Sequence, residues 1–99
     1  MRQVDWTMLA SRDLDELVAY IAEDSEQNAN LVGDRIERAA SHLGGAAIGH
    51  FGRVQNSYEF VVPKTSYILA YEKAETKIII LRVIHGSREW QNSRWPADD

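Results

Sequence analysis

The apolar residues in the first half of the chain recur with the spacing of helices. Leu14, Leu17, Val18 and Ile21 follow one another at intervals that place them on one face of a helix. Ser11 is a residue type that caps helix starts, and the acidic residues that follow it suit the positive end of the helix dipole. The pattern therefore predicts an amphipathic helix that begins near Ser11.

A second stripe of helical period begins after the first one. Its apolar positions are Ala29, Val32, Ile36, Ala39 or Ala40, and Leu43. We expect this helix to start near Ser25 and to stop at Gly44 and Gly45, because glycine adopts a left-handed cap at little cost. Only a few residues separate the two stripes, so they predict an antiparallel helix hairpin. The small residues Ala29 and Gly33 would let the two helices approach closely.

The rest of the sequence has the alternating pattern of strands. Val4, Trp6 and Met8 alternate with polar residues, which predicts a short strand before the first helix. Four β-rich segments follow the helices, at residues 52–55, 58–62, 67–72 and 77–85. Their short connections predict an antiparallel meander. The expected fold is α+β, with an N-terminal strand, an antiparallel helix hairpin, and an antiparallel β-meander packed on the hairpin.

Side-chain alternation assigns these residues to the two faces of the expected sheet. Charged groups belong on the face that the helices leave open, which places Glu59 and Arg82 there. Their apolar neighbours on that face are Val61, Ile68 and Ala70. The residues expected beneath the helix hairpin are Tyr58, Phe60, Tyr67, Leu69 and Tyr71. A cross-strand ion pair of Glu59 with Arg82, worth less than about 1 kcal/mol, is the simplest role for the two charges.

One strand is apolar on both of its faces. Residues 78–84 are apolar apart from Arg82, which predicts a central position in the sheet and cover on both sides. Alternation groups Arg82 with Ile80 and Ile84. Because two helices cover only one face, the other face must be small, polar or covered by a partner, and we expect a partner. The residues expected to lose solvent exposure when it binds are Glu59, Val61, Ile68 and Arg82.

Composition narrows the class of protein. With 99 residues, 44% hydrophobic and 26% charged, the chain suits a single folded domain over residues 1–99. It has no cysteine, which excludes a disulfide framework and thiol catalysis and favours a reducing compartment. No apolar run reaches the roughly 18 residues that span a bilayer, and the first residues lack an apolar signal core. We therefore expect a cytoplasmic protein that is neither secreted nor embedded in a membrane.

Charge is distributed unevenly along the chain. Residues 9–48 hold eight acidic residues and three arginines, whereas residues 49–97 hold four acidic and seven basic residues. The formal net charge of −4 disfavours a protein that binds DNA directly, because affinity for phosphates depends on an excess of lysine and arginine. The basic half is either a functional face or an ordinary solvated surface.

Few groups are suited to catalysis or to holding a metal. The three histidines, His42, His50 and His85, lack the spacing of metal ligands, so we expect no metal site and no cofactor. No serine lies in a nucleophile elbow, and the carboxylates of the first helix are typical of a solvated face.

The C-terminal segment combines basic and aromatic side chains. Arg88, Trp90, Arg94 and Trp95 are of the types that anchor interfaces, because they bury a large area while making directional contacts. We predict that these four residues bind a target. The alternative is that the two tryptophans fold back onto the core while the arginines stay solvated.

Several short segments are characteristic of one family when they are taken together. They are Asp13-Leu14 and Tyr20-Ile21 in the first helix, Gly52-Arg53 at the start of the meander, residues 61–67 around the first hairpin, and residues 80–90. In this order, over nearly the whole chain, they resemble the RelE/ParE superfamily of bacterial toxins, and specifically its ParE branch. The resemblance implies a RelE/ParE-like fold and the toxin of a type II toxin–antitoxin system.

The superfamily has two activities, which differ in the residues they need. The RelE branch cleaves mRNA on the ribosome and requires basic groups to activate the 2′-hydroxyl and stabilise the phosphate. By resemblance, Glu59, Val61 and Ile68 stand where that branch has lysines and an arginine, which leaves only Arg88 of a catalytic set. One arginine cannot serve as base, acid and clamp together. We therefore expect a protein that is not an enzyme. The resemblance to the ParE branch implies that it poisons DNA gyrase by binding.

The resemblance also implies two protein partners, an antitoxin and a target, and two alternative functions stay open. A ParD-like antitoxin, a ribbon–helix–helix DNA-binding protein, is expected to form a hetero-oligomer with the chain and to cover the open sheet face. DNA gyrase is the expected target of the C-terminal residues. The alternatives are a ribosome-dependent mRNA endonuclease of the RelE type and a non-toxic protein-binding module of the same fold.

Overall fold

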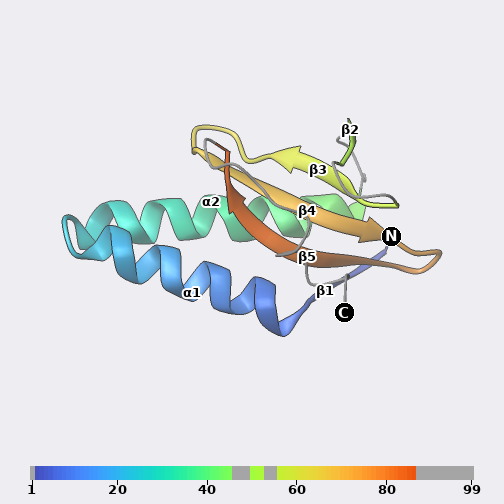
Figure 1. Ribbon diagram of the computed structural model, residues 1–99, viewed down its shortest axis with the longest axis horizontal. Coiled ribbons are helices and arrows are strands. Elements are labelled where there is room, and N and C mark those ends of the chain that lie inside the picture. Colours follow the sequence, from blue (N-terminus) through green and yellow to red (C-terminus); the bar gives the residue numbers. More distant parts are fainter. Residues whose placement is uncertain (1, 46–49, 53–55, 87–99) are drawn as a thin grey trace.

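The computed structural model describes residues 2–45, 50–52 and 56–86 as a five-stranded sheet with two helices on one of its faces (Figure 1). In chain order the elements are β1 (Gln3–Trp6), α1 (Met8–Ala22), α2 (Glu26–Gly45), β2 (His50–Phe51), β3 (Tyr58–Val61), β4 (Tyr67–Lys73) and β5 (Lys77–His85). The predicted α+β fold is confirmed. Neither helix is long and apolar enough to cross a membrane in the residues described.

The strands lie side by side in the order β1-β5-β4-β3-β2. Strands β2 to β5 pair antiparallel, as the short connections predicted. Strand β1 pairs with β5 in parallel, with Val4 opposite Ile78 and Trp6 opposite Ile80. The middle strand is therefore β4, and the prediction that residues 78–84 occupy the centre is wrong. Residues 78–84 are apolar on both faces because apolar side chains of β5 are buried on both sides of the sheet. Ile84, for example, is buried on the face away from the helices.

The helix boundaries follow from side chains that cap them. Helix α1 begins one residue after Thr7, whose Oγ1 accepts a hydrogen bond from Ala10 N at 3.0 Å. The prediction that Ser11 caps this helix is therefore wrong, and no acidic residue lies in its first turn. Ser25 does cap α2, since its Oγ accepts from Asn28 N at 3.1 Å, and α2 ends at Gly45 as predicted.

The core lies between the helices and the sheet. Its buried residues include Ile36 and Leu43 from α2 and Leu69, Tyr71 and Ile80 from the sheet. The predicted aromatic set is confirmed, because the partly buried residues packed against the core include Tyr58, Phe60 and Tyr67. Burial of this apolar area, at about 25 cal/mol per Å², is the main term that stabilises the fold.

Two glycines of α2 lie where a side chain would collide. A Cβ on Gly33 would lie 3.2 Å from Cγ2 of Val18, so the predicted close approach of the helices is confirmed. A Cβ on Gly44 would lie 2.7 Å from the carbonyl oxygen of Arg2, whose own N–H donates to Gly44 O at 2.8 Å. The end of α2 is thus fixed against the start of β1.

A β-bulge divides β5 into two halves. Ala70 of β4 lies opposite Arg82, and the next residue, Tyr71, lies opposite Ile80, so that Leu81 is the extra residue. The bulge reverses the alternation of side chains along β5. As a result Ile80 and Val83 both belong to the core, and the prediction that grouped Ile80 with Arg82 is wrong.

Candidate functional site

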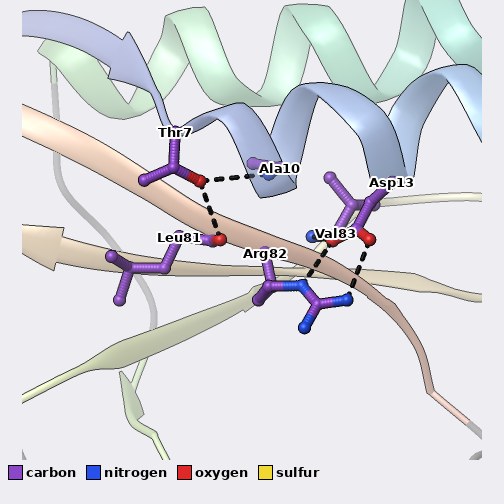
Figure 2. A network of polar contacts seen from close by, with 6 residues as sticks. All are labelled: Thr7, Ala10, Asp13, Leu81, Arg82 and Val83. Carbon is purple, nitrogen blue, oxygen red and sulfur yellow. Dashed lines mark hydrogen bonds and ion pairs between the residues drawn. The ribbon is translucent and has the colours of Figure 1, made fainter. Parts of the chain in front are cut away.

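The outer edge of β5 is hydrogen-bonded to β1 up to Ile80 and to groups of Thr7 and Asp13 beyond it. Beyond Trp6, the Thr7 N–H donates to the carbonyl oxygen of Ile80 at 3.0 Å, and Thr7 Oγ1 donates to the carbonyl oxygen of Leu81 at 3.0 Å. Six residues after Thr7, within α1, Asp13 Oδ2 accepts from the backbone N–H of Val83 at 3.0 Å (Figure 2). Polar side chains at the start of the helix therefore take the place of a strand along this edge.

Asp13 also holds Arg82 in a two-pronged ion pair. The guanidinium donates from Nε to Oδ2 at 2.7 Å and from Nη2 to Oδ1 at 2.9 Å, a planar geometry that suits arginine (Figure 2). The hydrogen bond to Asp13 raises the pKa of Arg82, an effect that burial partly opposes and the charges of Asp13 and Glu16 reinforce. Arg82 therefore turns to α1 in a helix-to-strand pair that the sequence did not predict, and the predicted pairing of Arg82 with Glu59 stays a prediction.

A hollow of about 550 Å³ opens beside this ion pair, between α1 and the ends of β4 and β5. Its lining residues are Asp13, Glu16, Leu17, Tyr20, Tyr67, Val83 and His85. The rings of Tyr67 and His85 meet edge to face at 5.2 Å, and Tyr20 is exposed over 72% of its surface. Exposed aromatic rings beside carboxylates suit the contact of a basic or aromatic side chain from a protein partner.

The four residues predicted to meet the antitoxin share one face, but they differ in exposure. Glu59 lies opposite Ala70, which lies opposite Arg82, and Val61 lies opposite Ile68. Glu59 is only 5% exposed and Arg82 is held by Asp13 of α1, and the contact of both residues with an antitoxin stays a prediction. Val61 is 52% exposed and Ile68 is partly exposed. These two remain available for contact.

The face is more closed than the sequence predicted because the chain itself buries part of it. Ala70 and Ile84 are buried there without belonging to the core beneath the helices. Ser57 is buried as well, and a Cβ on Gly52 would collide with its Oγ at 2.5 Å and approach Glu59 Cγ at 3.3 Å. Close packing around Glu59 thus leaves the exposed apolar surface concentrated at Val61 and Ile68.

The described residues offer binding surfaces more than reactive groups. Among them, no three histidine or carboxylate side chains are grouped to hold a metal ion. The Asp13 carboxylate accepts three hydrogen bonds, two from Arg82 and one from the backbone of Val83. The predicted target-binding residues Arg88, Trp90, Arg94 and Trp95 lie outside the described residues, and their role stays a prediction.

Sequence reasoning missed the roles of Thr7, Asp13 and Tyr20. Two signals were present: Thr7 is a capping residue between an alternating segment and a helical one, and Asp13 precedes Leu17 by one turn, beside the apolar stripe. An acidic residue at the edge of the buried apolar face of a helix can hydrogen-bond to a neighbouring helix or strand. Nothing in the local sequence shows that this element is β5.

Comparisons with known proteins point to a single family. A family model described as the ParE toxin of the type II toxin–antitoxin system parDE matches residues 4–90. The protein Y4kP of Sinorhizobium fredii, named as a candidate toxin, is 34% identical over 90 residues, which is 90% of this chain and 93% of that protein. A solved structure titled as a chromosomal ParDE system from P. aeruginosa superposes with a TM-score of 0.78 at 20% identity, covering 86% of this chain and 96% of that one. The last likeness supports the fold.

Proposed function

Because this chain belongs to the ParE toxin family of type II toxin–antitoxin systems, we propose that it arrests bacterial growth by binding DNA gyrase and that a cognate antitoxin neutralises it. The observation that carries the proposal is the family match, which runs from β1 to beyond the end of β5. The proposal places the protein in the cytoplasm, where gyrase and its DNA are found.

Inhibition by binding rather than by catalysis is the second part of the proposal. Its support is the chemistry of the sheet face: where the RelE resemblance would place basic catalytic groups, this chain has a buried glutamate, Glu59, and two aliphatic residues, Val61 and Ile68. A carboxylate would repel the phosphate that such an enzyme must stabilise. The competing hypothesis is ribosome-dependent mRNA cleavage by other residues.

The antitoxin is proposed to be ParD-like, with a ribbon–helix–helix DNA-binding domain, and to form a hetero-oligomer with this chain. Exposed apolar surface supports a protein partner, since Val61 and Ile68 lie side by side on β3 and β4, and Tyr20 projects from α1. Covering such surface is the usual source of affinity between proteins. Arg88, Trp90, Arg94 and Trp95 are proposed to contact gyrase.

Expression of the chain alone in bacteria tests the function. We expect growth arrest with a DNA-damage response and with intact mRNA, and we expect the arrest to be relieved when the antitoxin is co-expressed. A version lacking residues 90–99 should lose toxicity but stay folded and bound to the antitoxin if the target contacts lie in that segment. Growth arrest with cleaved mRNA and no DNA damage would support the endonuclease instead. No arrest at all would favour a non-toxic binding module.

A further inference from the structure

A groove on the other side of the helix layer is lined by cations over an apolar floor. It has a volume of about 320 Å³ and lies between α2 and the turn that joins β3 to β4. The lining residues are Arg35, Arg38, Ala39, His42, Phe60, Pro63 and Lys64. The function proposed above uses none of these residues.

The architecture explains why a groove forms at this place. Helix α2 packs on β1, β5 and β4, so the helix layer ends before it reaches the far edge of the sheet. Phe60 of β3 is therefore only partly buried beside α2, and it forms the floor together with Ala39 and Pro63. The positions 35, 38, 39 and 42 of α2 are spaced by one helical turn, which places them along the same wall.

The turn that forms the opposite wall is held in place by α2. Arg35 Nη1 donates to the carbonyl oxygen of Lys64 at 3.4 Å, which links the two walls. Lys64 adopts a left-handed conformation with φ of 63°, a geometry that glycine would accept more readily than lysine. Lys64 thus occupies a strained position at the rim of the groove.

The cations that line this groove have no carboxylate partner within the described part of the chain. Among the residues that the structure describes, no carboxylate pairs with Arg35, Arg38 or Lys64, and none lines the groove. This contrasts with the net charge of −4 for the whole chain. Three cations gathered around an apolar floor form a surface that is complementary to acidic residues flanking an apolar side chain.

We propose that this groove binds an acidic, amphipathic segment of a partner protein. An apolar side chain of the partner lies on Phe60 and Ala39, and its acidic neighbours pair with Arg38 and Lys64. A protein is favoured over a nucleic acid because the floor is aliphatic and aromatic, and because the acidic surface of the chain repels an extended phosphate backbone. The proposal assigns a partner chemistry to this surface and does not depend on gyrase being the target.

Fluorescence anisotropy with two synthetic helical peptides tests the proposal. Both peptides carry the same leucine and phenylalanine stripe, flanked by glutamates in one and by lysines in the other. The purified full chain should bind the glutamate peptide at least about tenfold more tightly, and added salt should weaken that binding. A spin label on the bound peptide should broaden the NMR signals of Phe60 and Ala39.

Charge reversal identifies the groove as the site. The double variant Arg38→Glu with Lys64→Glu should weaken binding of the glutamate peptide by about tenfold or more, whereas Arg12→Glu, an exposed arginine of α1, should leave it unchanged. Lys64→Gly removes one cation while suiting the turn, so it should weaken binding without lowering the unfolding temperature. Equal binding of both peptides, an equal loss in Arg12→Glu, or tighter binding of a DNA duplex through Arg38 and Lys64 would overturn the proposal.

Discussion

The two halves of β5 are closed at their outer edge in different ways. From Lys77 to Ile80 the strand pairs with β1, backbone to backbone. From Leu81, the bulge residue, onward, the side chains of Thr7, which caps α1, and of Asp13 in α1 hydrogen-bond to this edge instead. Within the described residues, an ion pair lies in each half. Asp5 meets Lys77 at 3.6 Å in the first half, and Asp13 meets Arg82 at 2.7 Å in the second.

The difference between the ion pairs lies in their solvent exposure and their geometry. The side chains of Asp5 and Lys77 are 39% and 47% exposed, whereas those of Asp13 and Arg82 are 13% and 17% exposed. Water and salt screen the first pair, and its loss leaves no buried group without a partner. Removal of Asp13 from the second pair takes two hydrogen bonds from the partly buried Arg82 and one from the backbone N–H of Val83. The two ion pairs on β5 therefore contribute differently to the stability of the fold, although each joins an aspartate to a basic residue.

The largest effect is expected from the second half. Asp13→Ala should lower the free energy of unfolding by about 2–4 kcal/mol, because the partly buried Arg82 loses two hydrogen bonds and the N–H of Val83 loses one. Asp5→Ala is the matched control and should cost less than about 1 kcal/mol. Urea unfolding of both variants measures the difference. Equal losses would show that the two edges are not distinguished by their side-chain pairs.

A smaller effect is expected at the residue where the two halves meet. Thr7→Ala removes the helix cap and the hydrogen bond to Leu81, so the free energy of unfolding should fall by about 1–2 kcal/mol. Thr7→Ser keeps the hydroxyl and should recover most of that loss. Amide hydrogen exchange should show faster opening at Ala10 in the alanine variant. A serine variant as unstable as the alanine variant would mean that the Thr7 methyl group, not the hydroxyl, supplies the stability.

The last effect is one on pH dependence and is expected from Tyr71, which lies opposite Ile80 beside the bulge. Burial, and secondarily the neighbouring Tyr58, raises the pKa of Tyr71 above 10.0. The neutral phenol thus favours the folded state below the unfolded pKa, and this stability is lost as the pH rises through the folded pKa. Tyr71→Phe should make the decline of stability above about pH 10 less steep. The exposed Tyr20→Phe is the control, and an identical decline in wild type and Tyr71→Phe would contradict the assignment.

Much of the fold was predictable because it follows from local periodicity. The stripes of α1 and α2 and the range of β5 reflect which side chains face the core, and that information lies within each segment. The cap at Ser25 and the stop at Gly45 are also local, because residues within one turn of the helix end decide them.

The candidate site was less predictable because it depends on contacts that are distant in sequence. Asp13 and Arg82 are joined only because β1 places the start of α1 beside β5 in a parallel pairing that no local pattern encodes. The bulge at Leu81 is equally hidden, since one extra residue reverses the side-chain alternation without changing the apolar character of the strand. Side-chain alternation therefore assigned Arg82 to the correct face, but it could not show that Asp13 of α1 is a partner of Arg82.

The central functional claim is that this ParE-family chain inhibits gyrase by binding and does not cut RNA. A purified system with gyrase, supercoiled plasmid and ATP tests it most directly when translating ribosomes with a defined mRNA are assayed beside it. The account predicts that the chain causes cleaved gyrase–DNA complexes to accumulate while the mRNA stays intact. Codon-dependent cleavage of the mRNA, with no accumulation of gyrase–DNA complexes, would contradict it.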